Sequence, residues 1–145
     1  MHELAEFNFS RAIAPMDDPR MASFVAHSNR INALAEASPG FVWRYNPPGE
    51  QSFALKAFED PLIYVTLSVW ESVEALRDFV FKTAHTPVMN RRSEWFLPLE
   101  PHLVMWWIAK GHRPTLAEAR AKIELLKAKG PTHEAFDFKN ISRRP

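Results

Sequence analysis

Hydrophobic and polar side chains alternate in two stretches of the chain, and each alternation predicts a β-strand. In residues 2–11, Ala5, Phe7 and Phe9 share one side, and mostly polar side chains occupy the other. Residues 62–70 hold aliphatic side chains at every second position. Their remaining positions are Tyr64, Thr66, Ser68 and Trp70. Successive side chains of a strand point to opposite faces of the sheet, so this second strand has an aliphatic face and a mixed face.

Shorter apolar runs predict further strands. Residues 41–45 form a short aromatic stretch, and residues 103–109 are apolar on both sides, as expected of a strand buried on both faces. Phe136 and Phe138 alternate with polar residues, which indicates a short strand or arm packed on an apolar surface. Residues 46–52 include two prolines and a glycine and are predicted to form a loop.

Helical periodicity and end signals predict three main helices. The first begins at Asp17-Asp18-Pro19 and ends before Pro39-Gly40. Ser72 is expected to cap the second. The buried stripe of that helix is predicted to be Val73, Leu76, Phe79 and Val80. A capping-box sequence, Thr115-Leu116-Ala117-Glu118, predicts a helix from Leu116 to the stop at Gly130-Pro131.

A further short helix is predicted between His85 and Pro98, because Thr86-Pro87 has the sequence of a helix start. On such a helix Arg92 would share a stripe with apolar residues. The members of the stripe are Val88, Arg92, Trp95 and Phe96. Two interpretations stay open. Arg92 extends past the rings into solvent, as long cationic side chains commonly do, or it points with His85 into a concave site and binds an anionic or carbonyl oxygen.

The order strand, helix, strand, strand, helix, strand predicts an α+β fold of the ferredoxin-like, split βαβ type with a four-stranded antiparallel sheet. Helices are expected on one face of the sheet, over the aliphatic side chains. The mixed face, which also contains Glu6 and Asn8, is expected to pack against a second copy in a homodimer. The length of 145 residues fits a single domain over residues 1–139 with a frayed tail at residues 140–145.

Composition excludes several classes of function. Eighteen basic and seventeen acidic residues give a net charge of +1, which offers no basis for a nucleic-acid or anionic-membrane partner. The absence of cysteine excludes disulfides, thiolate nucleophiles and cysteine metal sites. No apolar run approaches the roughly 20 residues that cross a bilayer, and the first residues are acidic where a signal peptide is basic. The expectation is a cytoplasmic protein.

The sequence predicts no metal site, because no two of the six histidines are spaced to place two ligands on one helix face. It also lacks the glycine-rich dinucleotide loop, the P-loop and the nucleophile elbow. No cofactor is therefore expected. The exception is haem, for which a single histidine is enough, with His85 or His102 as the ligand.

Aromatic residues are the strongest indication of a small-molecule site. Eleven Phe, five Trp and two Tyr exceed the usual needs of a small core, and tryptophan is seldom fully buried. The competing interpretation of each ring is packing in the core. The candidate ligand-binding residues are Trp43, Tyr64, Ser68, Trp70, Trp95, Phe96 and Trp106. Glu6 and Asn8 are further candidates for polar contacts, although solvated or interfacial positions account for them more simply.

Several separated motifs carry a resemblance to a known family. They are Ser68-Val69-Trp70-Glu71-Ser72, His85 with residues 91–96, Trp107 with residues 111–115, Glu118-Ala119, and residues 130–132 with Ala135-Phe136. Together they resemble a bacterial family of unknown function in the dimeric α/β-barrel superfamily, from the first strand to Phe138. The resemblance implies a ferredoxin-like fold that pairs into a two-sheet barrel. The superfamily includes antibiotic-biosynthesis-type monooxygenases and several haem proteins, so it implies a fold more than a chemistry.

The combined expectation is a small-molecule-binding protein. As an enzyme it would be a cofactor-independent, monooxygenase-like protein that acts on a flat, apolar, partly oxygenated metabolite. His85 would then be the general base and Arg92 the group that binds the substrate oxygen. The alternatives are a non-catalytic ligand-binding protein and a haem-binding protein with a single histidine ligand. For His85, a structural role at the helix end is an equal alternative.

Overall fold

The computed structural model describes residues 1–46 and 56–145; residues 47–52 of the expected loop lie outside these ranges. Its sheet has five strands: β1 (His2–Ala12), β2 (Phe41–Arg44), β3 (Ile63–Trp70), β4 (Phe96–Leu97) and β5 (Leu103–Ala109). The strand β1 is central, with β3 along one side and both β4 and β5 along the other, and β2 lies outside β3. All pairings are antiparallel. The predicted α+β class and ferredoxin-like strand order are thus confirmed. The prediction of four strands is wrong, because the short strand β4 pairs with the end of β1 and adds a fifth.

The main helices begin and end close to their predicted residues. They are α1 (Ala22–Glu36), preceded by a 3₁₀ turn (Pro19–Met21), α2 (Val73–Ala84), α3 (Pro87–Asn90) and α4 (Leu116–Lys129). The Ser72 hydroxyl accepts a hydrogen bond from the Ala75 N–H at 3.1 Å, and the Thr115 hydroxyl accepts one from the Glu118 N–H at 3.1 Å. These caps satisfy N–H groups that have no partner inside the helix, which explains the sharp starts. No helix of the described ranges is long and apolar enough to span a membrane.

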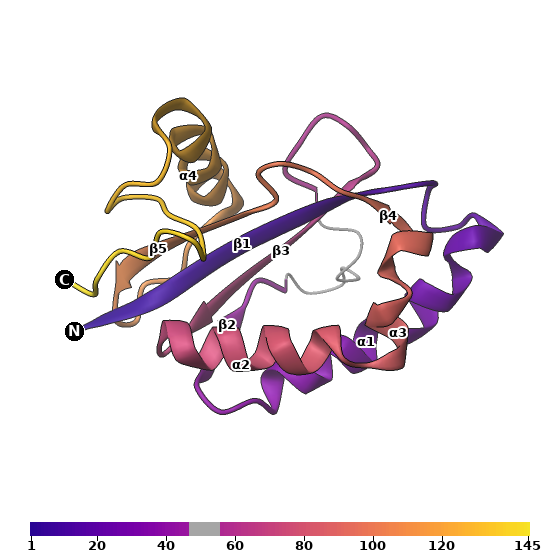
Figure 1. Ribbon diagram of the computed structural model, residues 1–145, viewed down its shortest axis with the longest axis horizontal. Coiled ribbons are helices and arrows are strands. Elements are labelled where there is room, and N and C mark those ends of the chain that lie inside the picture. Colours follow the sequence, from indigo (N-terminus) through magenta and orange to yellow (C-terminus); the bar gives the residue numbers. More distant parts are fainter. Residues whose placement is uncertain (47–55) are drawn as a thin grey trace.

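Helices cover both faces of the sheet, whereas the pattern predicts helices on one face. Figure 1 shows α1 and α2 on one side of the sheet and α4 on the other. Three residues of α4, Ala119, Ile123 and Leu126, are buried against the aliphatic face. Their spacing of three and four residues places them on one stripe of the helix, so α4 seals this face.

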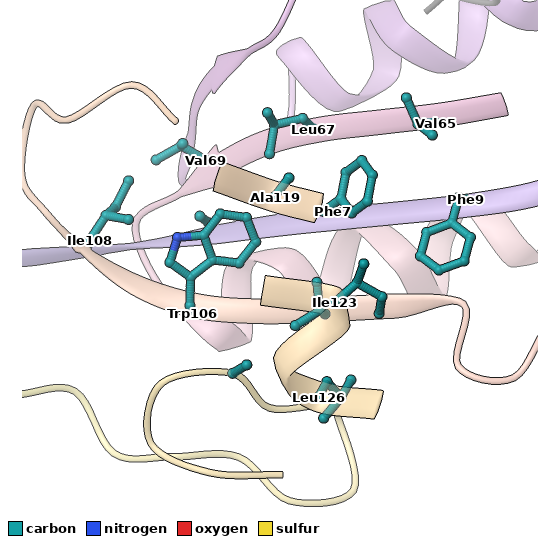
Figure 2. Packing of buried hydrophobic residues seen from close by; sticks show 13 residues of the cluster. Phe7, Phe9, Val65, Leu67, Val69, Trp106, Ile108, Ala119, Ile123 and Leu126 are labelled. Carbon is teal, nitrogen blue, oxygen red and sulfur yellow. The ribbon is translucent and has the colours of Figure 1, made fainter. Parts of the chain in front are cut away.

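The aliphatic face forms the largest core cluster. Its sheet residues are Ala5, Phe7 and Phe9 from β1, Val65, Leu67 and Val69 from β3, and Val104, Trp106 and Ile108 from β5. Figure 2 shows most of these side chains together with Ala119, Ile123 and Leu126 of α4, which belong to the same cluster. A fully buried side chain of this kind stabilises a fold by roughly 1.5–3 kcal/mol. This cluster is therefore the main support of the sheet.

Part of the mixed face packs against α1 and α2 of the same chain, so the expectation that a second copy covers the whole of it is wrong. Leu4 and Trp70 are buried with Val73 and Leu76 of α2 and with Ala35 of α1. The alternation shows that the two faces differ, but it cannot show which face receives the two crossover helices. That choice follows from the handedness of the crossovers and the order of the strands.

The expected helix between His85 and Pro98 is cut short. The helix α3 ends at Asn90, a 3₁₀ turn spans Arg92–Glu94, and Phe96–Leu97 is extended as β4. Backbone pairing explains the difference, because Phe96 and Leu97 pair with Ala12 and Arg11 of β1. The predicted stripe of Val88, Arg92, Trp95 and Phe96 therefore does not form on a helix.

The C-terminal segment docks on the sheet. Phe136 is buried and exchanges two backbone hydrogen bonds with Met105, at 2.8 and 2.9 Å, as the prediction of a docked arm requires. The tail at residues 140–145 is expected to fray, but two of its residues make contacts. The Trp107 Nε1–H donates to the Ser142 carbonyl at 2.9 Å, and Arg144 Nη2 donates to the Glu71 carbonyl at 2.6 Å.

Candidate functional site

A buried carboxyl lies at the centre of the mixed face. In the register of β1 and β3, Glu6 stands opposite Ser68, and Leu4 stands opposite Trp70. The Trp70 Nε1–H donates to the Ser68 hydroxyl at 2.9 Å, and this hydroxyl donates to Oε2 of Glu6 at 3.0 Å. The other oxygen of Glu6 accepts a hydrogen bond from the side-chain amide of Asn8. Glu6 is thereby fixed in one orientation although it is only 3% exposed.

Burial raises the pKa of Glu6 to about 7, and the hydrogen bonds from Asn8 and Ser68 partly oppose this increase. Loss of solvation disfavours the charged form of a carboxyl, whereas hydrogen bonds to the carboxylate favour it. Within residues 1–46 and 56–145, no cationic side chain forms an ion pair with Glu6. The carboxyl is therefore suited to exchange a proton near neutral pH.

The mixed face remains partly open beside Glu6. Its residues Asn8, Ser10, Tyr64 and Thr66 are half-buried although β1 and β3 are the central strands. The alternate residues of the same strands, Phe7, Phe9, Val65 and Leu67, are buried under α4. One end of the open part is closed by Trp70, whose ring stacks on Phe79 of α2 with centroids 5.2 Å apart. A molecule on this part of the mixed face would thus meet hydroxyl and amide groups, with the buried Trp70 as the end of the open part.

A groove of about 350 Å³ opens at the other end of the mixed face. Its lining includes Ser10, Arg92, Phe96, Leu99 and His102. Arg92 is exposed, and its Nη2 donates to the Ser10 hydroxyl at 2.9 Å. Ser10 follows Glu6 by four residues on the same face of β1, and a rise of about 3.4 Å per residue separates their Cα atoms by roughly 14 Å. The groove and the buried carboxyl are therefore two ends of one polar row.

His85 does not line this groove. The second interpretation of Arg92, in which both side chains point into one concave site, requires that it does. It ends α2 and is exposed, and its Nδ1 lies 2.8 Å from the Phe81 carbonyl oxygen. Its ring also packs against the Phe81 ring, with centroids 4.4 Å apart. These contacts match the structural role at a helix end. A catalytic role for His85 or Arg92 stays a prediction.

The seven predicted ligand-binding residues lie in three places. Tyr64, Ser68 and Trp70 share the mixed face with Glu6. Trp95 and Phe96 lie together in the cluster around Met21 and Phe24, where Trp95 is buried. Phe96 packs edge-on against Phe24 with centroids 4.8 Å apart and lines the groove. Trp43 and Trp106 belong to the core of the aliphatic face, so a ligand on the mixed face cannot contact them through the sheet.

Comparison with known proteins identifies the family of this chain. The family model described as a domain of unknown function, DUF3291, matches residues 3–145. The chain belongs to the DUF3291 family. No curated protein is significantly similar to it in sequence.

Solved structures show distant similarity to this DUF3291 protein. SnoaB, a cofactor-independent oxygenase from Streptomyces nogalater, aligns with 81% of the chain and 100% of its own length, at 18% identity and a TM-score of 0.46. A mutant form of the same oxygenase aligns with 77% of the chain and 95% of its own length, at 16% identity and a TM-score of 0.45. NE2512, a protein of unknown function from Nitrosomonas europaea, aligns with 79% of the chain and 95% of its own length, at 14% identity and a TM-score of 0.48.

Sequence patterns do not predict the positions of three polar residues of this DUF3291 protein on or near the mixed face. Glu6 is interpreted from its pattern as solvated or interfacial, but it is buried at the centre of the site. Arg44 also lies on the mixed face, opposite Ser68. The Lys56 Nζ lies 3.1 Å from the centroid of the Tyr64 ring, and burial lowers the pKa of this ammonium. A carboxylate between the apolar residues Ala5 and Phe7 of a predicted strand is the one signal that points to Glu6 in advance.

The part of the chain that the structure describes contains no group of three His, Asp or Glu residues that could hold a metal ion. The residues proposed for haem do not fit this cofactor either. A haem ligand has to project from an apolar pocket onto the iron. Both His85 and His102 are exposed, and the His85 imidazole contacts a backbone carbonyl.

Proposed function

We propose that this DUF3291 protein binds a flat, apolar, partly oxygenated molecule on the mixed face of its sheet, and that Glu6 takes a proton from it. The observation that supports the proposal is the carboxyl of Glu6, buried and held by Ser68 and Asn8, with a pKa of about 7. Catalytic bases work best when their pKa lies near the working pH. An ordinary glutamate has a pKa of 4.5 and is a weaker base.

The site also favours such a ligand by its walls. The half-buried rings of Phe79 and Tyr64 are flat and largely apolar, and the half-buried Asn8 and Thr66 offer polar contacts. Most small-molecule sites combine apolar walls with a few polar groups in this way. A planar molecule with one or two oxygen atoms is therefore the best match.

The reaction we propose is monooxygenase-like and begins with proton transfer. Removal of a proton from a ring CH2 group or from a phenol leaves a carbanion or phenolate, and such an anion can react with dioxygen directly. One oxygen atom becomes a carbonyl oxygen of the product, and the other leaves as water with two hydrogens of the substrate, so the substrate supplies all four electrons. The protein would supply the base and an environment with little water, which strengthens electrostatic interactions. In this proposal Glu6 replaces His85 as the base, and Arg92 binds an oxygen of the ligand at the groove.

A matched pair of variants tests this function. Full-length wild-type protein and the Glu6→Gln variant are incubated in air with a panel of hydroxylated polycyclic aromatic compounds, and the products are analysed by mass spectrometry. We expect an oxygen-dependent mass increase for at least one compound with the wild type, and none with Glu6→Gln. Glu3→Gln is the control, because Glu3 is a buried glutamate of the same strand that contacts Gly111 and not Ser68. Binding without turnover in the wild type would identify the protein as a non-catalytic binder.

A homodimer is part of the proposal, although its first argument, a mixed face that no helix covers, no longer holds, because α1 and α2 cover part of this face. What supports it now is an apolar surface on the outer side of α2, where Val80 is 41% and Phe81 66% exposed. Val80 is predicted to be buried in the helix stripe, so its exposure leaves apolar area for a partner. Light scattering at micromolar concentration should return twice the mass of 16.7 kDa. A monomer mass would reject the dimer.

A further inference from the structure

Arg44 lies in the same cross-strand row as the buried carboxyl. Arg44 of β2 stands opposite Ser68 of β3, and Ser68 stands opposite Glu6 of β1. Adjacent strands are about 4.8 Å apart, so roughly 10 Å separates the backbones of Arg44 and Glu6. The row thus places a guanidinium and a carboxyl on one face of the sheet, with the Ser68 hydroxyl between them.

The guanidinium of Arg44 is only partly satisfied. Its Nη2 donates to Oε1 of Glu36 at 2.8 Å, and the Arg44 side chain is 14% exposed, against 50% for Glu36. Its Nε and Nη1 are buried and have no hydrogen-bond partner. Among the residues that the structure describes, these are the only buried side-chain nitrogen or oxygen atoms in that condition.

Buried guanidinium nitrogens without an acceptor destabilise the folded protein unless a bound molecule supplies one. A buried donor without an acceptor costs about 1–3 kcal/mol, and more when the group is charged. Arginine stays protonated in proteins, so it cannot relieve this cost by losing a proton. An oxygen atom that accepts from Nε or Nη1 would remove the penalty, and a negatively charged oxygen would do so most effectively.

We infer that Arg44 binds a carboxylate or carbonyl oxygen of the molecule from which Glu6 takes a proton, an inference that rests on the proposed function. The substrate class is then a planar molecule whose acidic C–H or O–H is conjugated to such an oxygen. When that bond breaks, the proton moves to the Glu6 carboxylate. The electron pair of the broken bond is delocalised onto the oxygen that Arg44 holds. This step consumes no oxidant, and a positive group at the developing charge is what stabilises it.

Two probes that differ by one carboxylate test the inference. The full-length protein is titrated with 3-hydroxy-2-naphthoate and with 2-naphthol, and the quenching of tryptophan fluorescence gives both dissociation constants. We expect Arg44→Met to weaken binding of the naphthoate about tenfold or more and binding of 2-naphthol less than about twofold, because one charged hydrogen bond is lost. Arg44→Lys should recover only part of the loss, since an ammonium lacks the shape of the guanidinium.

Arg30→Met is the matched control, because Arg30 is an exposed arginine of α1 whose removal changes the net charge equally. Three results would overturn the inference. Arg44→Met weakens the binding of both probes equally, Arg30→Met weakens naphthoate binding as much as Arg44→Met does, or the wild type does not bind the naphthoate. If Arg44→Met does not fold, Arg44→Lys provides the test. It should bind the naphthoate more weakly than the wild type does and bind 2-naphthol about equally well. The readout is selectivity in binding, so a failure of turnover would reject the proposed enzyme without affecting the conclusion on Arg44.

Discussion

The hydroxyl of Ser68 donates a hydrogen bond of 3.0 Å to Glu6, a residue 62 positions earlier in the chain. The strand pairing that joins them also buries the carboxyl between the sheet and its crossover helices. Because the hydrogen bonds offset only part of the loss of solvation, protonation of Glu6 is linked to the stability of the fold.

Glu6→Gln should make the protein less sensitive to pH. The pKa of Glu6 is about 7 in the folded state against 4.5 for an ordinary glutamate, so the folded state binds the proton more tightly. The stability from Glu6 is therefore complete below pH 4.5 and is lost as the pH rises to about 7. At about 1.4 kcal/mol per pKa unit, the loss is roughly 3 kcal/mol.

Urea unfolding of wild type and Glu6→Gln between about pH 4.5 and 8 measures this effect. The free energy of unfolding of the wild type should fall by roughly 3 kcal/mol more than that of the variant. Glu3→Gln should follow the wild type. Parallel curves for wild type and Glu6→Gln would show that Glu6 has an ordinary pKa.

Gly40→Ala should destabilise the fold much more than Gly111→Ala. Both glycines have positive φ angles, +84° and +92°, so alanine is strained at either position. A Cβ atom at Gly40 would lie only 2.4 Å from the Cβ of Ala75, whereas one at Gly111 would meet nothing within 4 Å. We expect about 1 kcal/mol for Gly111→Ala and at least twice that for Gly40→Ala, measured by urea unfolding. Equal losses would show that α2 moves away at no cost.

Arg92→Leu should leave the fold intact. Arg92 is exposed and makes a single hydrogen bond, to Ser10, so its removal should change the free energy of unfolding by less than about 1 kcal/mol. A ligand that uses this guanidinium should bind about 1.5–3 kcal/mol more weakly. Arg92→Lys should not restore the binding fully. Unfolding of Arg92→Leu would instead show that this arginine supports the architecture.

Phe136→Ala should cost far more stability than Phe138→Ala. Phe136 is fully buried and pairs with Met105, whereas Phe138 is half-buried. Removal of a buried phenylalanine side chain typically costs about 3–5 kcal/mol, and we expect less than half of this for Phe138→Ala. Thermal unfolding followed by circular dichroism measures both. Equal, small effects would mean that the C-terminal segment is not docked in solution.

The sequence by itself determines the elements that depend on neighbouring residues. The alternation in residues 2–11 and 62–70 identifies β1 and β3, because side chains of a strand alternate between two faces. Ser72 and Thr115 identify the starts of α2 and α4, because a cap acts within three residues of its own position. Such local rules also suffice for the order of elements and hence for the fold class.

Only the tertiary structure decides what depends on residues far apart in the chain. Pairing of Phe96 with Ala12 ends the helix expected after His85, because strand pairing outweighs a weak helical preference. The same kind of long-range contact places Glu6 beside Ser68. It also places α1 and α2 over part of the mixed face, which the sequence pattern does not predict. The pKa of a carboxyl depends on everything that excludes water from it, and only the assembled sheet and helices determine that surrounding for Glu6.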